Sequence, residues 1–281
     1  MDKWHIITDS SCDIFDFKEK YDNIDYTSVP FVFDIDGKQY VDDDKLNISE
    51  FIAAMKASKK PSRSACPSPQ TWFELFQQGG KIFAITISKE LSGSYNSANT
   101  ARHMMLEKDP DSQIYIINAR STGPALIIVV DYLLKLIQEG FDFDTITKKV
   151  EEYIDHCYTV FALCSFDNLV KNGRVGKLSG FIAGRLNLWG IGIGTREGKI
   201  EVTAKVRGKV RAVKAIIDEA KQRGVLPDRC IISHCLNLEA AEAVKEKFLE
   251  YSPETEIVIY DTRGLDTFYA EHQGIVVTYH I

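Results

Sequence analysis

The sequence lacks the long apolar runs that membrane-spanning helices and secretory signals require. No stretch of the 281 residues approaches the roughly 18 consecutive apolar residues that cross a bilayer. The N-terminal stretch, Met1 to Ile7, holds no apolar segment of the kind found in signal peptides. We therefore expect a cytoplasmic protein without stable membrane insertion.

Cysteine is sparse and shows no repeated spacing. The six cysteines lie at positions 12, 66, 157, 164, 230 and 235. Cys230 and Cys235 form one Cys-x4-Cys pair, but a zinc site of this kind needs a second pair of ligands. We expect free thiols and no metal site.

The glycine motifs of nucleotide-binding proteins are also missing. No Gly-x-Gly-x-x-Gly follows the first apolar run, and no Gly-x4-Gly-Lys-Ser/Thr loop occurs anywhere. The sequence therefore predicts neither a nucleotide site nor another cofactor. The Gly-x-Ser-x-Gly elbow of serine hydrolases is absent as well.

The charge balance argues against a nucleic-acid partner. The formal net charge is −6 at pH 7, whereas a general nucleic-acid binder needs many basic residues to neutralise phosphates. The basic stretch Lys205 to Arg211 alternates basic and apolar residues, which is typical of a solvated face.

What the first half does contain is one pattern repeated three times. An apolar, β-branched run ends in a loop of hydroxyl side chains, and a helical pattern follows; the runs span residues 4–8, 82–87 and 113–118. Strands that alternate with helices predict a parallel sheet covered on both faces. Ligands of such sheets bind at the carboxyl ends of the strands, where these loops lie.

The second half mixes helices with a hairpin and predicts an α+β arrangement. Its expected elements include a strand at 159–165, a helix of small residues at about 178–185, two strands around Glu197-Gly198 and a terminal strand at 275–279. The predicted fold class is α/β with two domains. We expect an N-terminal α/β domain at 1–157, with a hairpin insert at about 29–60, and a C-terminal α+β domain at 158–281.

Several local signals within the insert are informative. Asp36-Gly37 predicts a two-residue hairpin turn, and Ser49 is expected to cap a short helix. Asp42, Asp43 and Asp44 are adjacent, whereas cation ligands usually alternate, so we expect a solvated loop. Residues 59–69 are rich in proline and serine and predict a loop, which ends where Ser68-Pro69 starts a helix.

The loop after the second run carries the strongest chemical signal. Ser92, Gly93 and Ser94 stand between a buried strand and a helix that is expected from Asn96 to Leu106. Such a position offers free backbone N–H groups and hydroxyls to an anion. The alternative is that Ser92 or Ser94 only caps the helix.

The motifs and their order resemble the DegV family, the fatty-acid-binding subunits of bacterial fatty acid kinase. The resemblance covers essentially the whole chain. The most specific piece is Ile87 to Ala98, which is similar to the family's Leu-Ser-Gly-Thr-Tyr signature. Residues 6–11 match the opening strand and Asp-Ser loop of the family, and residues 64–69 resemble its Thr-Ser-Gln-Pro-Ser-Pro loop. Residues 169–175 resemble the Leu-x-x-Gly-Gly-Arg-Ile motif, and residues 271–274 also fit the pattern near the end of the chain.

This resemblance implies that a long-chain fatty acid lies in an apolar tunnel between two domains. Its carboxylate would rest on Ser64 and Ser92, with Gly93, Ser94 and His272 in support. Arg174 and His272 would serve the transfer by which an ATP-dependent partner kinase forms the acyl phosphate. The chain itself would be a ligand-binding subunit of phospholipid metabolism, without catalytic residues and not an enzyme.

Other interpretations stay open at this point. Arg174 is also compatible with a surface position, and His272 with an ordinary histidine at a strand end. The protein could instead be a lipid carrier or sensor without a kinase, a hydrolase that uses Ser92, or a binder of phosphorylated or sugar ligands. The sequence departs from the family pattern at Trp189 and at Gly274-Ile275-Val276, which bear on chain-length preference and kinase coupling.

Overall fold

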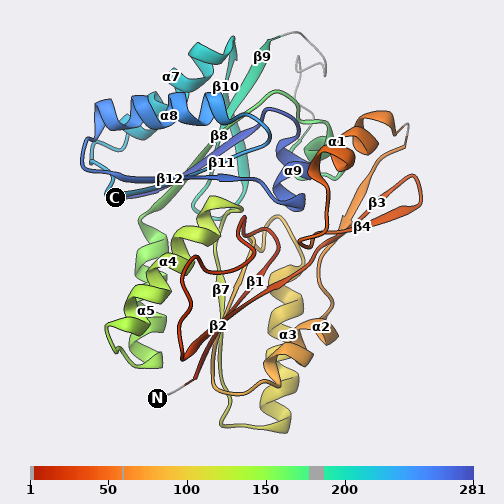
Figure 1. Cartoon of the computed structure of the whole chain (residues 1–281), viewed down its shortest axis with the longest axis vertical. Helices are drawn as coiled ribbons and strands as arrows, with labels where there is room; N and C mark the ends of the chain where they lie inside the picture. The colour runs from red at the N-terminus through yellow and green to blue at the C-terminus, as the bar shows by residue number, and fades with distance from the viewer. Residues whose placement is uncertain (1–2, 59, 177–186) are drawn as a thin grey trace.

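The computed structural model describes residues 3–58, 60–176 and 187–281, which form two large sheets, one above the other, and a small sheet at their side (Figure 1). The helix expected at 178–185 lies outside the described residues. None of the described helices combines the length and the apolar character of a membrane span.

The first sheet is parallel, as the alternating pattern predicts. Its strand order is β2 (Ile24–Val29), β1 (Trp4–Asp9), β6 (Lys81–Thr86) and β7 (Gln113–Asn118). Helices α2 (Pro69–Phe76) and α3 (Ser94–Lys108) cover one face, and α4 (Pro124–Gln138) and α5 (Phe143–Asp155) cover the other (Figure 1).

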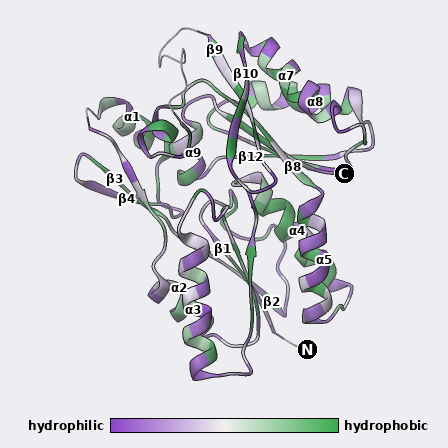
Figure 2. Ribbon diagram, turned by 180° about the vertical axis from the view of Figure 1, so that it is seen from behind, coloured by the Kyte–Doolittle hydropathy of each residue, from purple (hydrophilic) through white to green (hydrophobic). Residues whose placement is uncertain are grey.

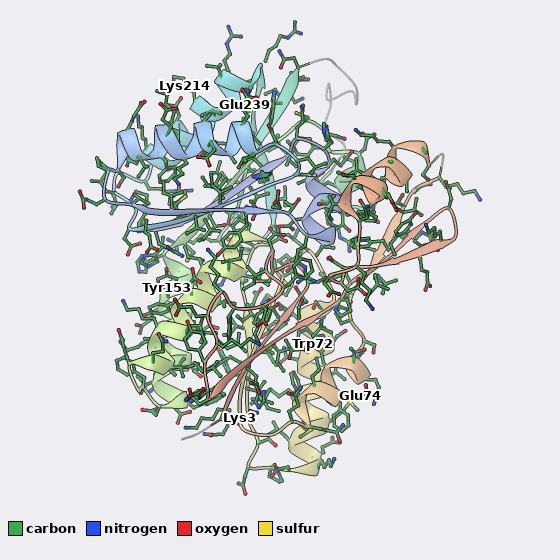
Figure 3. All side chains as sticks on the ribbon, in the orientation of Figure 1. Lys3, Trp72, Glu74, Tyr153, Lys214 and Glu239 are labelled. Atoms are coloured by element: carbon green, nitrogen blue, oxygen red, sulfur yellow. The ribbon has the colours of Figure 1, made fainter. Side chains whose placement is uncertain are left out.

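Both faces of this sheet are buried because successive strand residues point to opposite sides. Ile6 belongs to the core under α4 and α5, whereas its neighbour Ile7 packs with Trp72 under α2 and α3. Trp72 is fully buried where α2 meets the sheet (Figure 3). Figure 2 shows the resulting alternation of hydrophilic and hydrophobic residues along α2 and α3.

The small sheet contains β4 (Lys38–Val41), β3 (Val32–Ile35) and β5 (Arg63–Ala65), with α1 (Ile48–Ala57) beside it. The hairpin turn is confirmed, because Asp36 and Gly37 have φ values of 53° and 83°, as a tight turn of this kind requires. The loop expected at 59–69 is wrong in part, since β5 pairs with β3 there. The cap of α1 is Asn47, which accepts from the backbone N–H of Glu50, and not Ser49.

The second large sheet is mixed. Its order is β10 (Ile200–Arg207), β9 (Leu188–Gly194), β8 (Cys157–Leu163), β13 (Ile275–His280), β11 (Arg229–His234) and β12 (Glu256–Asp261). Strands β11 and β12 pair in parallel, and the other described pairs are antiparallel. Helices α7 (Lys209–Lys221) and α8 (Leu238–Tyr251) cover the outer face, and α4 packs on the inner face at β11 and β13.

Two short helices stand beside the junction of the sheets, α6 (Asp167–Lys171) and α9 (Gly264–Ala270). No sequence signal predicted α9, whereas the strands expected at 159–165 and 275–279 and the two strands around Glu197-Gly198 correspond to β8, β13, β9 and β10. The chain passes from the first sheet to the second between α5 and β8. We therefore propose the domain division near residue 157.

Candidate functional site

The buried carboxylate of Asp9 joins two of the hydroxyl loops. Its oxygens accept from the backbone N–H of Ile87 (3.1 Å), from Ser94 Oγ (2.6 Å) and from Ser11 Oγ (2.5 Å). Burial raises the pKa of Asp9, and these donated hydrogen bonds oppose the rise. Because all these partners are the protein's own loops, Asp9 closes the loops rather than serving chemistry.

The third hydroxyl loop and the turn between β9 and β10 lie at the same edge of the first sheet as the other two loops. Ser88 donates its backbone N–H to the carbonyl of Ser121 (2.9 Å) and its Oγ to the carbonyl of Gly198 (2.7 Å). Gly198 has a φ of 91°, and a Cβ atom there would lie 2.2 Å from Ser88 Oγ. A glycine is thus needed for the turn of the second sheet to reach the loops of the first.

Two hydroxyls and a guanidinium that the sequence singled out lie around one cavity, which we call the hydroxyl cavity. It is lined by Ser64, Ser92 and Arg174. Its volume, taken as the space open to the centre of a water molecule, is about 40 Å³. Ser64 Oγ lies 2.8 Å from Tyr269 Oη, and Arg174 Nε donates to the carbonyl of Leu91 (2.9 Å). The remaining wall residues are Phe31, Ile87, Leu91, Thr122, Leu169, Ile200, Leu265, Asp266 and Tyr269.

A second cavity, which we call the apolar cavity, adjoins the first. The volume of the apolar cavity, measured in the same way, is about 60 Å³. The wall residues that it shares with the hydroxyl cavity are Leu91, Thr122, Leu169, Ile200, Asp266 and Tyr269. Its further wall includes Phe161, Leu163 and Val276 from the second sheet. The two cavities therefore form a narrow apolar space between the sheets with hydroxyl and guanidinium donors at one end.

Gly93 and Ser94 contribute to the framework of this space and not to its lining residues. Gly93 caps α3 without a side chain, and a Cβ atom there would lie 3.4 Å from Cys66 Sγ. Ser94 is buried, donates its Oγ to Asp9 and gives its backbone N–H to Ser92 Oγ (3.2 Å). This bond orients the Ser92 hydroxyl. The N-cap residue of α3 is Gly93, so neither serine occupies the cap position.

His272 lies apart from the other predicted site residues. It stands on the turn after α9 and is not among the residues that line either cavity. Partial burial lowers the pKa of His272, and the charge of Lys56 on α1 lowers it further. The preceding residue, Glu271, fixes the turn by accepting from Ser165 Oγ (2.8 Å) and from the backbone N–H of Asn168 (3.2 Å).

Sequence reasoning missed three polar residues in the wall of the hydroxyl cavity, Thr122, Asp266 and Tyr269. Thr122 Oγ1 donates to Asp266 Oδ1 (2.5 Å), and both residues line both cavities. Asp266 and Tyr269 are three residues apart, which places them on one side of a helix. That spacing was the available signal, but it has value only once α9 is known to be a helix.

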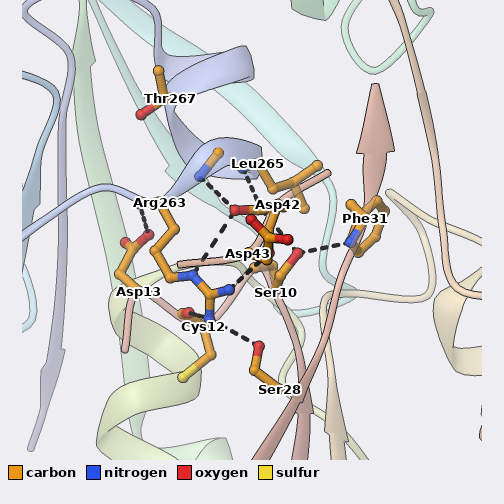
Figure 4. A network of polar contacts seen from close by, with 12 residues as sticks. Ser10, Cys12, Asp13, Ser28, Phe31, Asp42, Asp43, Arg263, Leu265 and Thr267 are labelled. Carbon is orange, nitrogen blue, oxygen red and sulfur yellow. Dashed lines mark hydrogen bonds and ion pairs between the residues drawn. The ribbon is translucent and has the colours of Figure 1, made fainter. Parts of the chain in front are cut away.

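A buried ionic cluster holds α9 in place (Figure 4). Asp42 accepts from Ser10 Oγ and from the backbone N–H groups of Gly264 and Leu265, each at 2.8 Å, and Arg263 Nε lies 3.8 Å from Asp42 Oδ1. Asp42 is 1% exposed, so the expected solvated loop is wrong at this residue. Burial raises the pKa of Asp42, and the Arg263 charge is the main opposing influence.

A second carboxyl group beside this cluster faces Asp266. Asp13 Oδ1 accepts from the backbone N–H of Arg263 (2.7 Å), and Asp13 and Asp266 both lie against Gly123, where a Cβ atom would be 2.9 Å and 1.9 Å from their Oδ2 atoms. Burial raises the pKa of Asp13 to about 7. Burial, followed by the Asp13 charge, raises the pKa of Asp266 well above its usual range. Burial and mutual repulsion therefore favour a proton on this pair, which reduces the negative charge of the cavity wall at this point.

Ionisable clusters elsewhere do not suggest a metal site. Within the described ranges, no group of three or more His, Cys, Asp or Glu side chains could hold a metal ion. The six cysteines are free, as the sequence predicted.

Comparison with known proteins agrees on one family. The family model described as "Uncharacterised protein, DegV family" matches residues 3–277. A DegV domain-containing protein of Streptococcus pneumoniae is 35% identical over 278 residues, which cover 99% of both chains.

Solved structures give the same result. The Streptococcus pneumoniae fatty acid kinase B3 protein, loaded with linoleic acid, superimposes with a TM-score of 0.95 at 35% identity over 99% of both chains. A DegV family protein from Eubacterium eligens, loaded with heptadecanoic acid, superimposes with a TM-score of 0.92 at 29% identity over 99% of both chains.

Proposed function

The chain belongs to the DegV family, and from that premise we propose that it binds one long-chain fatty acid and presents the carboxylate to an ATP-dependent acyl kinase. The acyl chain would lie in the apolar cavity and its carboxylate in the hydroxyl cavity. The observation that carries the proposal is the placement of Ser64, Ser92 and Arg174 around one end of an apolar space.

The polar end suits a carboxylate. Hydroxyl and guanidinium donors form strong hydrogen bonds to a carboxylate, because the acceptor is charged. Ser92 already accepts the Ser94 backbone N–H, so its own proton is available for a ligand. The raised pKa of Asp266 favours its uncharged form, which does not repel the incoming charge.

The apolar end supplies the affinity. Burial of an alkyl chain contributes about 0.8 kcal/mol per CH₂ group, so ~15 methylenes offer on the order of 10 kcal/mol before ordering costs. Phe161, Leu163 and Val276 provide the surface against which such a chain packs. The linoleic acid and heptadecanoic acid bound by two similar proteins are ligands of this class.

The chemistry of phosphoryl transfer would belong to the partner kinase. Arg174 stands at the carboxylate end, whereas His272 lies on the half-buried turn after α9, outside both cavities and within the influence of the Lys56 charge. We propose that Arg174 faces the transferred group and that His272 faces the kinase. Hydrolysis by Ser92 is disfavoured, because no histidine that could act as its base is found among the described wall residues.

Mass spectrometry of lipid extracted from the purified protein tests the binding proposal. We expect about one equivalent of a C16 to C18 acid in the native protein and much less in Ser92→Ala. Ser112→Ala, at the opposite end of the first sheet, is the matched control and should retain the lipid. A native protein that is empty and takes up no added fatty acid would refute the proposal.

Kinase coupling needs a separate experiment. The loaded protein is mixed with an acyl kinase and ATP, and acyl phosphate is trapped with hydroxylamine. Formation of the hydroxamate supports a kinase subunit. Retention of the lipid without any product would identify a carrier or sensor instead.

A further inference from the structure

The apolar cavity adjoins a third cavity at the end away from Ser64 and Ser92. This charged cavity has a volume of about 250 Å³ and shares with the apolar cavity Arg120, Ser121, Thr159 and Gly194. It shares no wall residue with the hydroxyl cavity. The three spaces therefore follow one another in the order hydroxyl, apolar, charged.

Hydroxyl groups stand where the apolar and charged cavities meet. Ser121 Oγ donates to Thr159 Oγ1 (2.9 Å), which lies 2.8 Å from Thr278 Oγ1. The Ser121 oxygen can still accept a hydrogen bond, because a hydroxyl has two lone pairs. Gly194 leaves room beside it, since a Cβ atom at that position would lie 3.7 Å from Ser121 Oγ and 3.5 Å from Thr159 Cβ.

The charges around this end are balanced. The wall of the charged cavity carries three basic and three acidic side chains, namely Arg120, Arg196, Arg223, Asp155, Glu197 and Glu201. Arg120 pairs with Asp155 at 2.5 Å and lies 3.6 Å from Glu151. The wall of the charged cavity thus offers no excess of positive charge, and Arg120 already has a carboxylate partner, which favours a neutral polar group over a second carboxylate.

Resting on the proposed function, we propose that the three cavities form one passage and that the site accepts long-chain acids with a hydroxyl at or near the terminal carbon. The carboxylate lies at Ser64 and Ser92, and the terminal hydroxyl donates to Ser121 Oγ at the charged cavity. In a closed apolar pocket such a hydroxyl would lose its hydrogen bonds to water, which weakens binding roughly tenfold or more. The open polar end removes that cost.

The test compares hexadecanoic acid with 16-hydroxyhexadecanoic acid on the delipidated full chain, by calorimetric titration. We expect the two dissociation constants to agree within about threefold. Thr159→Val and Ser121→Ala each remove one hydroxyl of the junction. Because both residues also line the apolar cavity, the readout is the ratio of the two dissociation constants: each variant should weaken the hydroxy acid several-fold more than it weakens hexadecanoic acid. Urea unfolding shows that the variants are folded, and equal weakening of both ligands would contradict the inference.

Each other outcome overturns the inference. If the hydroxy acid binds at least tenfold more weakly than hexadecanoic acid to the native protein, the cavities are separated by a wall and the proposed function stands alone. If hexadecanedioic acid binds as tightly as the hydroxy acid, the terminal site does not select a neutral group. If neither the parent acid nor the hydroxy acid binds, the proposed function fails together with the inference.

Discussion

Ser64 and Tyr269 are separated by 205 residues in the sequence, yet their hydroxyl oxygens lie 2.8 Å apart. The bond joins β5 of the small sheet to α9 beside the second large sheet. It also places Tyr269 in the wall of both cavities. The position of the Ser64 hydroxyl therefore depends on a helix that the sequence did not predict.

Removal of the Tyr269 hydroxyl should weaken fatty acid binding. Tyr269→Phe keeps the ring in the wall but releases Ser64, and one lost hydrogen bond of this kind corresponds to about 1 kcal/mol, or roughly fivefold in affinity. Titration with hexadecanoic acid measures the effect. Tyr40→Phe, on β4 of the same small sheet, is the control, and equal affinities for all three proteins would contradict the prediction.

Replacement of Phe161 should change which acyl chains are bound. Gly192 allows Phe161 to lie across β9, since a Cβ atom there would lie 2.3 Å from Phe161 Cζ, and Phe161 lines the apolar cavity. Phe161→Leu enlarges this space, so we expect the extracted lipid to shift towards longer or more bent chains.

Phe248→Leu is the matched control for that variant. Phe248 belongs to α8 and is fully buried in the core between this helix and the outer face of the second sheet. Both variants should lose stability, by about 1–3 kcal/mol, because each leaves unfilled space in a packed region. An identical lipid profile in native protein and Phe161→Leu would show that Phe161 does not select the chain.

The Asp13–Asp266 pair should make the protein less stable as the pH rises. The pKa of Asp13 is about 7 in the folded protein and 3.8 as its ordinary value, so between these limits the folded state binds more protons than the unfolded state. The free energy of unfolding then falls with rising pH, by up to about 1.4 kcal/mol per pH unit for one proton, and the contribution of Asp13 to this fall levels off above pH 7.

Urea unfolding at pH 4 to 8 checks this dependence. Asp13→Asn should flatten the fall, whereas Asp16→Asn, an exposed residue of the same loop, should not. Other carboxyl groups with raised pKa values, such as Asp9 and Asp42, titrate in every protein and cancel in the comparison. Parallel curves for the native protein and Asp13→Asn would show that the pair holds no extra proton.

Loss of the Asp42 charge should destabilise the protein strongly. Asp42→Asn leaves the buried Arg263 guanidinium without its carboxylate and replaces one of the two oxygens that accept from the first N–H groups of α9 with a donor. Removal of one member of a buried ion pair costs about 3–5 kcal/mol. Asp44→Asn, in the same acidic run but exposed, should stay within about 0.5 kcal/mol in urea unfolding, and equal losses for both would contradict this role.

Local patterns in the sequence determined much of the fold. The strand–loop–helix units that begin with β6 and β7, the Asp36-Gly37 turn and the helix start at Ser68-Pro69 each depend on neighbouring residues, and the structure confirms them. The unit expected from the run at 4–8 is wrong in part, because the loop after β1 leads to β2 and not to a helix. The convergence of the three hydroxyl loops also followed from the sequence, because parallel strands end at one edge. Ser64, Ser92 and Arg174 came from the family resemblance, and the structure places them around one cavity.

Tertiary structure alone decided α9, the burial of Asp42 and the roles of Asp266 and Tyr269. Helix α9 has seven residues, too few to be stable by propensity, and its buried residues include the polar Asp266 and Thr267, so it shows no apolar stripe. Its first N–H groups are satisfied by Asp42, 222 residues earlier in the chain for Gly264. A helix that depends on an acceptor so distant leaves no local signal, and so the wall that it builds could be seen only in the folded protein.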